Sequence, residues 1–218
     1  METKACIFDL DGVIVDTAVY HFKAWQKIAR SLGFDFTHDM NERLKGISRV
    51  DSLNMLLEMA EIKKEEHEKQ LLCQIKNEYY LDFLSDMNDS AILPGIKVFL
   101  NNLESKGIKI ALGSASKNAH KVLELIGLKE KFEVIVDGNG VSKSKPDPEV
   151  FLNGATQLGV QPAESIVFED SLKGLEAAQA GGFRTVGIGS AENLPIAEVV
   201  YKDLVDISIE NIWQALNK

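Results

Sequence analysis

Short apolar runs alternate with amphipathic helical segments along most of this chain. The runs have the length and near-continuous apolar character of strands that are buried on both faces of a sheet. They cover residues 5–10, 108–112, 132–136, 165–168 and 185–188. The segments between them carry apolar residues at helical spacing and end at glycine, a common helix terminator. This alternation predicts an α/β fold with a doubly wound parallel, Rossmann-like sheet.

The segment 17–90 interrupts this alternation. It contains three helical patterns, at about 20–32, 51–60 and 64–84, and no convincing strand. The third pattern has an apolar stripe amid charged residues, which is typical of a helix with one buried face. The sequence therefore predicts a small, all-helical cap domain at 16–90, inserted after the first strand. The α/β core would comprise residues 1–15 and 91–218.

The composition is that of an ordinary globular protein, with 45% apolar and 26% charged residues among 218. No apolar run approaches the ~20 residues that cross a bilayer, and the first residues lack the pattern of an export signal. The net charge of −9 argues against a nucleic acid or an anionic membrane as partner. The two cysteines, Cys6 and Cys73, indicate reduced thiols in a cytoplasmic protein rather than a disulfide.

Carboxylates follow two of the predicted strands at the point where each strand ends. Asp9 and Asp11 follow the first strand, and Glu169 and Asp170 follow a later one. Ligands bind beyond the carboxyl ends of parallel strands, so these four side chains would meet in one crevice. They would repel one another strongly unless a cation lay among them. Oxygen ligands without a nearby histidine or cysteine favour Mg²⁺ over Zn²⁺, and we therefore expect Mg²⁺ as cofactor.

The spacing of Asp9 and Asp11 suits phosphoryl transfer. Side chains two residues apart in extended backbone point the same way, about 6–7 Å apart. One carboxylate can then attack phosphorus while the other contacts the hydroxyl that leaves or attacks. Alone, Asp-x-Asp-Gly could equally be a capped turn. Ser114 and Lys145 follow other strands and could bind the phosphate, although such a serine can be a helix cap and an isolated lysine is most often solvated.

Four segments together resemble the motifs of the haloacid-dehalogenase-like phosphotransferase superfamily: DLDGV at 9–13, GSAS at 113–116, SKPDP at 144–148 and FEDS at 168–171. The resemblance spans the whole chain, and the helical insertion matches that superfamily's smaller, C1-type cap. It implies that Asp9 is the nucleophile and Asp11 the general acid and base. Ser114 and Lys145 would be the catalytic groups that hold the transferring phosphate. The implied Mg²⁺ ligands are Asp9, the backbone carbonyl of Asp11, Glu169 and Asp170.

The cap resembles that of superfamily members that interconvert β-D-glucose 1-phosphate and glucose 6-phosphate. These mutases pass through a phospho-aspartate and a 1,6-bisphosphate, so they need a second phosphate site. Arg49 could hold a phosphate with two parallel hydrogen bonds, and Ser116 to Asn118 precede a predicted helix. The substrate-binding residues implied by the resemblance are Thr17, His21, Trp25, Lys45, Gly46, Ile47, Arg49, Lys76, Ala115, Ser116, Lys117 and Asn118.

Plainer roles remain open for the cap residues. Trp25 could simply pack in a core, His21 could be exposed, and Arg49 could pair with Asp51. A sugar-phosphate phosphatase of the same superfamily is the alternative function, and a non-catalytic protein that binds phosphosugars is a third. In each case we expect a small-molecule sugar phosphate as the partner and a monomeric protein.

Overall fold

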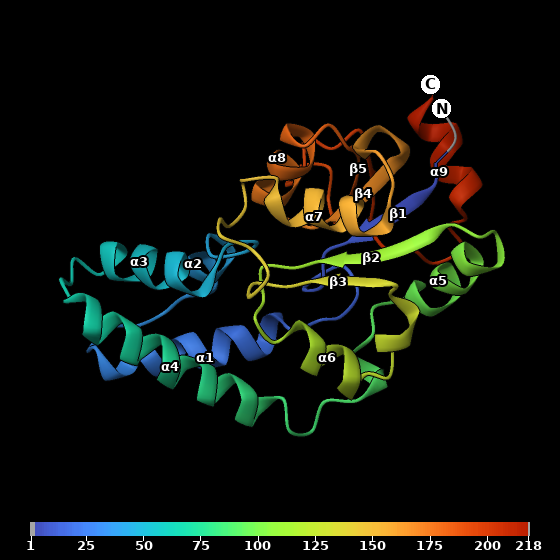
Figure 1. Ribbon diagram of the computed structural model, residues 1–218. Coiled ribbons are helices and arrows are strands. Elements are labelled where there is room, and N and C mark those ends of the chain that lie inside the picture. The colour runs from blue at the N-terminus through green and yellow to red at the C-terminus, as the bar shows by residue number, and fades with distance from the viewer. Residues whose placement is uncertain (1–2, 218) are drawn as a thin grey trace.

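The computed structural model describes residues 3–217 as a sheet domain with a group of four helices at one end (Figure 1). The strands are β1 (Ala5–Phe8), β2 (Lys109–Gly113), β3 (Val134–Val136), β4 (Ser165–Glu169), β5 (Arg184–Ile188) and β6 (Val199–Tyr201). They form one parallel sheet in the order β3-β2-β1-β4-β5-β6, which confirms the predicted doubly wound α/β fold. The sequence pattern does not predict the edge strand β6, because three half-buried residues are too few to show a period.

Helices cover both faces of the sheet (Figure 1). Those of the sheet domain are α5 (Ile96–Ser105), α6 (Ala119–Leu125), α7 (Glu149–Leu158), α8 (Leu172–Ala180) and α9 (Ile209–Leu216), with 3₁₀ helices η1 (Asp89–Ala91), η2 (Lys129–Lys131) and η3 (Pro162–Glu164). Cys6 and Phe8 of β1 pack with α5, α6 and α9, whereas Ala5 and Ile7 pack with α7 and α8. Successive strand side chains point to opposite faces, so two helical layers bury β1 completely. Within the described part of the chain, no helix is both long and apolar enough to cross a membrane.

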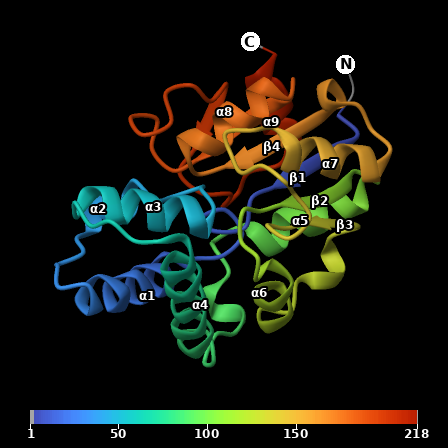
Figure 2. The same cartoon turned by 60° about the vertical axis from the view of Figure 1, so that its left-hand side comes forward.

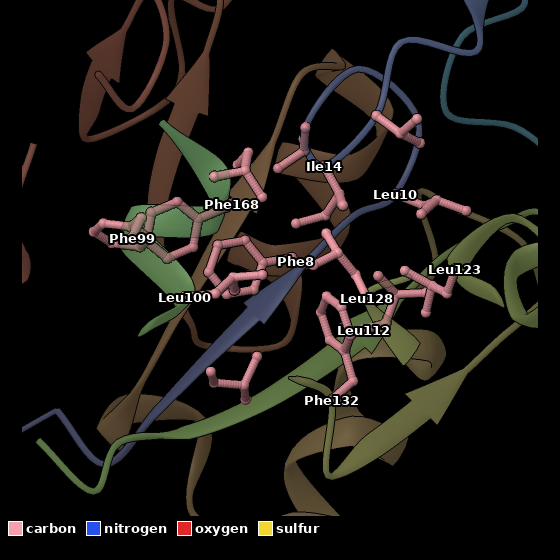
Figure 3. Packing of buried hydrophobic residues seen from close by; sticks show 14 of the residues in the cluster. Phe8, Leu10, Ile14, Phe99, Leu100, Leu112, Leu123, Leu128, Phe132 and Phe168 are labelled. Carbon is pink, nitrogen blue, oxygen red and sulfur yellow. The ribbon is translucent and has the colours of Figure 1, made fainter. Parts of the chain in front are cut away.

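A cluster of phenylalanines holds β1 in register (Figure 3). Phe8 stacks on Phe168 of β4 with ring centroids 4.5 Å apart, and it meets Phe99 and Phe132 edge-on at 6.2 and 6.5 Å. Phe8 and Phe168 are also partners in the sheet register. The residues that follow them, Asp9 and Glu169, therefore leave the sheet side by side.

The remaining helices form the group beside the sheet domain, which we call the cap helices (Figures 1 and 2). They are α1 (Ala18–Ser31), α2 (His38–Glu42), α3 (Arg49–Met59) and α4 (Glu66–Phe83). They enclose a hydrophobic cluster of their own around Trp25, Leu53 and Leu56. The three helices expected from the sequence are confirmed. The structure adds α2, which is only five residues long and gives no periodic signal.

The chain enters and leaves the cap helices at neighbouring points. The Asp16 N–H donates to the Ala91 carbonyl at 3.1 Å, and the Leu93 N–H donates to the Ile14 carbonyl at 3.0 Å. The two connections therefore run side by side, as expected for a cap inserted into the core. The domain boundaries at residues 16 and 90 stay a prediction.

Candidate active site

A cavity of about 1000 Å³ lies between the cap helices and the loops that follow the strands. Most residues singled out in the sequence line it, including Asp9 and Asp11 from the core and His21, Arg49 and Lys76 from the cap. The others that line it are Thr17, Trp25, Lys45, Gly46, Ile47, Ala115, Ser116, Lys117, Asn118 and Asp170. Three predicted residues, Ser114, Lys145 and Glu169, are instead buried behind its wall.

Lys145 joins the two carboxylates that leave the sheet together. Its ammonium donates to Asp9 Oδ1 and to Glu169 Oε1, each at 2.6 Å. Burial alone would lower the pKa of Lys145, but the two carboxylates outweigh burial and raise it, so the lysine is charged. This excludes the solvated role that remained open for Lys145, which is 3% exposed.

The environment of Asp9 makes its negative charge unfavourable in the absence of a further cation. Burial raises the pKa of this carboxyl to about 7 against the opposing charge of Lys145. The neighbouring carboxylates of Glu169 and Asp11 add to the rise.

Glu169 is held rigidly by its neighbours. Its Oε2 accepts hydrogen bonds from the backbone N–H and the hydroxyl of Ser171, both at 2.8 Å. Gly174, in the first turn of α8, leaves room for this carboxylate, since a Cβ there would lie 1.8 Å from Glu169 Oε1. With Lys145 on Oε1, both oxygens of Glu169 already have partners.

Asp170 lies next to the turn that follows β1. A Cβ at Gly12, where φ is +81°, would lie 2.1 Å from Asp170 Oδ2, so only glycine allows this approach. Burial raises the pKa of Asp170 well above its usual range, and the charges of Glu169 and Asp9 raise it further, with Lys45 opposing. The negative charge of Asp170 is thus poorly compensated by the protein.

The charges at the strand ends suit a bound cation. Lys145 pairs with two carboxylates, while Asp170 and Asp11 add further negative charge. A divalent ion would relieve the desolvation and repulsion that raise these pKa values, and oxygen donors favour a hard cation. Within residues 3–217, however, no three His, Cys, Asp or Glu side chains converge as metal ligands would. The predicted set of ligands stays a prediction.

A second group of residues surrounds Asp11. Its Oδ1 accepts the hydroxyl of Thr17, and His21 Nε2 lies 3.8 Å from the same oxygen. On the other side of the ring, His21 Nδ1 lies 2.9 Å from Lys76 Nζ. Burial alone would raise the pKa of Asp11, but His21 and Thr17 outweigh it and lower that pKa. His21 is therefore not an exposed residue: it links a carboxylate of the core to a lysine of the cap.

Lys76 is a buried cation without a carboxylate within ion-pair distance among the described residues. Its Nζ lies over the rings of Trp25 and Tyr80, 5.0 and 4.7 Å from their centroids. Burial lowers the pKa of Lys76 to about 7, and the nearby charge of Arg49 lowers it further. Trp25 both packs in the cap core and faces the cavity, so the two roles left open by the sequence are compatible.

A third group joins the cap to the core at the far side of the cavity. The Oδ1 of Asn77 accepts from the guanidinium of Arg49 and from the amide of Asn118, each at 2.8 Å. Asp51 accepts from serine hydroxyls instead of pairing with Arg49. The guanidinium, with Lys117 and Asn118, thus forms a cationic and amide-lined wall. Such a wall can bind an anion.

Some details were not accessible from the sequence. Helix α6 begins at Ala119, so Ser114 is not its cap; its hydroxyl accepts the Ser116 N–H at 3.1 Å in the turn before the helix. Buried Ser52 also lines the cavity, but a serine on an amphipathic helix gives no functional signal. Asn77 is the most informative addition, because its bridging role depends on two segments far apart in the chain.

Comparison with known proteins gives consistent results. The sequence matches the haloacid dehalogenase-like hydrolase family over residues 6–188. It is 43% identical to a β-phosphoglucomutase of Bacillus subtilis over 95% of this chain and 92% of that protein. It is 34% identical to a phosphorylated carbohydrates phosphatase of Thermotoga maritima, over 84% and 83% of the two chains. A crystal structure of β-phosphoglucomutase from Clostridium difficile superimposes with a TM-score of 0.95 at 41% identity. The match covers 99% of this chain and 97% of that one.

The buried Lys76 should destabilise the free protein in a pH-dependent way. Its pKa is about 7 in the folded state against 10.5 ordinarily. Between these values the unfolded chain binds more protons, so stability rises with pH and is lost as the pH falls towards 7. Lys76→Met should therefore raise the free energy of unfolding by about 1–3 kcal/mol at pH 7 and by much less near pH 10.

Urea unfolding of wild type and variant at both pH values measures this difference. Lys63, an exposed lysine of the cap just before α4, provides the control, since Lys63→Met should change stability equally at the two pH values. A gain in the free energy of unfolding of Lys76→Met that did not depend on pH would contradict the lowered pKa of Lys76.

Proposed function

Because the chain belongs to the haloacid dehalogenase-like hydrolase family, we propose that it acts as a β-phosphoglucomutase and interconverts β-D-glucose 1-phosphate and glucose 6-phosphate. The observation that carries this proposal is the likeness to two β-phosphoglucomutases over almost the full length of both chains. The site agrees with it, because a single cavity has anion-binding groups at two places.

The two places correspond to the two ends of a sugar bisphosphate. At the strand ends, Asp9 and Lys145 would handle the phosphoryl group that is transferred. Across the cavity, Arg49, Lys117 and Asn118 would hold the other phosphate, displacing or sharing the hydrogen bonds now made to Asn77. A simple phosphatase needs only the first of these sites.

We propose Mg²⁺ as the cofactor, held by Asp9, the backbone carbonyl of Asp11, Glu169 and Asp170. When bound, it would supply positive charge to the oxygens of the transferring phosphoryl group. The buried negative charge around Asp170 supports this assignment. Because both oxygens of Glu169 already accept hydrogen bonds, its contact with the ion would have to be shared with Lys145 or Ser171.

Two aspartates would have separate roles in the reaction: Asp9 would carry the phosphoryl group and Asp11 would carry the proton. Phosphorylated Asp9 would transfer its phosphoryl group to the C6 hydroxyl of β-D-glucose 1-phosphate, while Asp11 takes the hydroxyl proton. The resulting 1,6-bisphosphate would then rotate within the cavity, so that its C1 phosphate meets Asp9. Asp9 would accept the phosphoryl group from C1 while Asp11 returns the proton to the C1 oxygen. His21 and Thr17 lower the pKa of Asp11, which keeps its carboxylate ionised before the first step, although the same shift makes it a weaker base.

A sugar-phosphate phosphatase is the second candidate, and the likeness to the Thermotoga maritima phosphatase favours it. In that case water would accept the phosphoryl group from Asp9. A cap that closes over the strand ends would favour the mutase, because it would limit the access of water to a phospho-aspartate. The monomeric state and the cytoplasmic location expected from the sequence stay predictions.

One assay separates these functions. The protein is incubated with β-D-glucose 1-phosphate, Mg²⁺ and a trace of the 1,6-bisphosphate, and glucose 6-phosphate and inorganic phosphate are quantified together. The mutase should form glucose 6-phosphate in large excess over phosphate. Phosphate as the dominant product would identify the phosphatase, and an absence of turnover would indicate a binding protein.

Asp11→Ala should separate proton transfer from metal binding. We expect turnover to fall by about 10²–10⁴-fold, because the general acid and base is lost. Mg²⁺ affinity, measured by isothermal titration calorimetry, should change little, since the proposed ligand is the backbone carbonyl. Asp35→Ala, which removes an exposed carboxylate on the cap, is the matched control. Loss of Mg²⁺ binding in Asp11→Ala would show that the side chain has a different role.

Arg49→Lys should test the second phosphate site. Lysine keeps the charge but loses the planar pair of donors, so kcat/KM for isomerisation should fall about 10–100-fold. Hydrolysis of p-nitrophenyl phosphate, which has one phosphate, should fall much less. Arg30→Lys, an exposed change on α1, should affect neither activity. Equal losses in both assays would rule out a separate second site.

A further inference from the structure

A second cavity, of about 300 Å³, lies between the start of α3 and the loop that carries Lys145. Helix α3 begins at Arg49, and its N-cap is Ser48, whose hydroxyl accepts the Asp51 N–H at 3.2 Å. The Ser48 hydroxyl also donates to Asp51 Oδ2 at 2.5 Å. This local arrangement fixes the Asp51 carboxylate at the end of the helix that faces the core.

Asp51 makes a hydrogen bond that crosses from the cap to the core. Its Oδ2 accepts the hydroxyl of Ser144 at 2.5 Å, although the two residues are 93 positions apart in the chain. Ser144 is the residue immediately before Lys145. Asp51 is two residues after Arg49, so this contact connects the proposed phosphate ligand of the cap to the lysine that bridges Asp9 and Glu169.

The Asp51–Ser144 contact lies outside the substrate cavity. Both residues line the smaller cavity, and neither lines the larger one. The Asn77–Asn118 bond also joins cap to core, but Asn118 lines the substrate cavity, where a bound phosphate would compete for it. The Asp51–Ser144 contact can persist when the cavity is filled.

We propose that Asp51 is a positioning residue that couples the closed arrangement of the cap to the placement of Lys145, through its hydrogen bond to Ser144. The inference rests on the proposed function and adds no chemical step to it. In the arrangement seen here Asp51 already accepts the Ser144 hydroxyl and fixes the loop next to Lys145, and sugar phosphate bound to Arg49 would hold the cap in this arrangement. When the cap is displaced, Ser144 loses its acceptor.

The loop has a separate anchor on its core side, and this provides a matched control. The Ser142 hydroxyl donates to Glu149 Oε2 at 2.8 Å, and the backbone N–H groups of Ser142 and Lys143 donate to the same carboxylate at 2.9 and 2.8 Å. Ser142 is two residues before Ser144 and likewise gives its hydroxyl to a carboxylate, but one that belongs to the core. Only the hydrogen bond from Ser144 to Asp51 should depend on the position of the cap.

The test compares Ser144→Ala with Ser142→Ala in the full-length protein loaded with Mg²⁺. Loss of a hydrogen bond to a carboxylate should lower kcat/KM for isomerisation about five- to tenfold in Ser144→Ala and about twofold at most in Ser142→Ala. The hydrolysis of p-nitrophenyl phosphate, which also depends on Lys145, should fall by a similar factor in Ser144→Ala and stay unchanged in Ser142→Ala. The ratio of phosphate to glucose 6-phosphate should rise only in Ser144→Ala. Ser144→Thr, which keeps the hydroxyl, should restore isomerisation.

A double-mutant cycle identifies Asp51 as the partner. Asp51→Ala and the double variant Asp51→Ala, Ser144→Ala should show the same kcat/KM, because the second change removes nothing further. Additive losses, an unchanged rate of isomerisation in Ser144→Ala, or unchanged hydrolysis of p-nitrophenyl phosphate in that variant would each overturn the proposal. Failure of the wild type to isomerise β-D-glucose 1-phosphate would refute the proposed function instead. In that case the same double-mutant cycle is measured with kcat/KM for the release of phosphate from the sugar phosphate.

Discussion

The shared ammonium of Lys145 is the interaction on which the candidate site depends. Two carboxylates leave neighbouring strands at adjacent positions because Phe8 and Phe168 fix their register. Without a cation between them, Asp9 and Glu169 would repel each other in a site that is almost dry. The Lys145 ammonium donates a hydrogen bond to each carboxylate at 2.6 Å, yet burial still raises the pKa of Asp9. The protein therefore compensates only part of the negative charge it buries, and this favours an additional cation there.

The sequence predicted the core of this site well because its signals are local. Each predicted site residue lies at the end of an apolar run, and parallel strands bring their carboxyl ends to one edge of the sheet. Asp9, Asp11 and Asp170 could therefore be placed together without a structure. The identity of the loop containing Lys145 required the resemblance of four motifs, since an isolated lysine carries no such signal. Arg49, the proposed phosphate ligand, could not be separated from a surface ion pair until the structure placed Asn77 beside it and gave Asp51 a different partner.

What the sequence did not predict has two physical origins. The strand β6 and the helix α2 are three and five residues long, which is too short for a period of two or 3.6 to appear. Asn77, Ser52 and Ser144 acquire their roles only from contacts between segments that are distant in the chain. Polar residues of this kind are common on exposed helices and loops, so their type alone does not distinguish a bridging residue from a solvated one.

The central position of β1 in the sheet has a consequence for biosynthesis. This strand is translated first, but its two neighbours are β2, which starts at Lys109, and β4, which starts at Ser165. Until β2 has been made, β1 has no partner strand, whereas the cap helices, which are made before β2, can already fold on one another. Assembly of the sheet must therefore wait for the residues after 108, and until then the nascent protein exposes an aggregation-prone strand, where chaperones would be expected to bind.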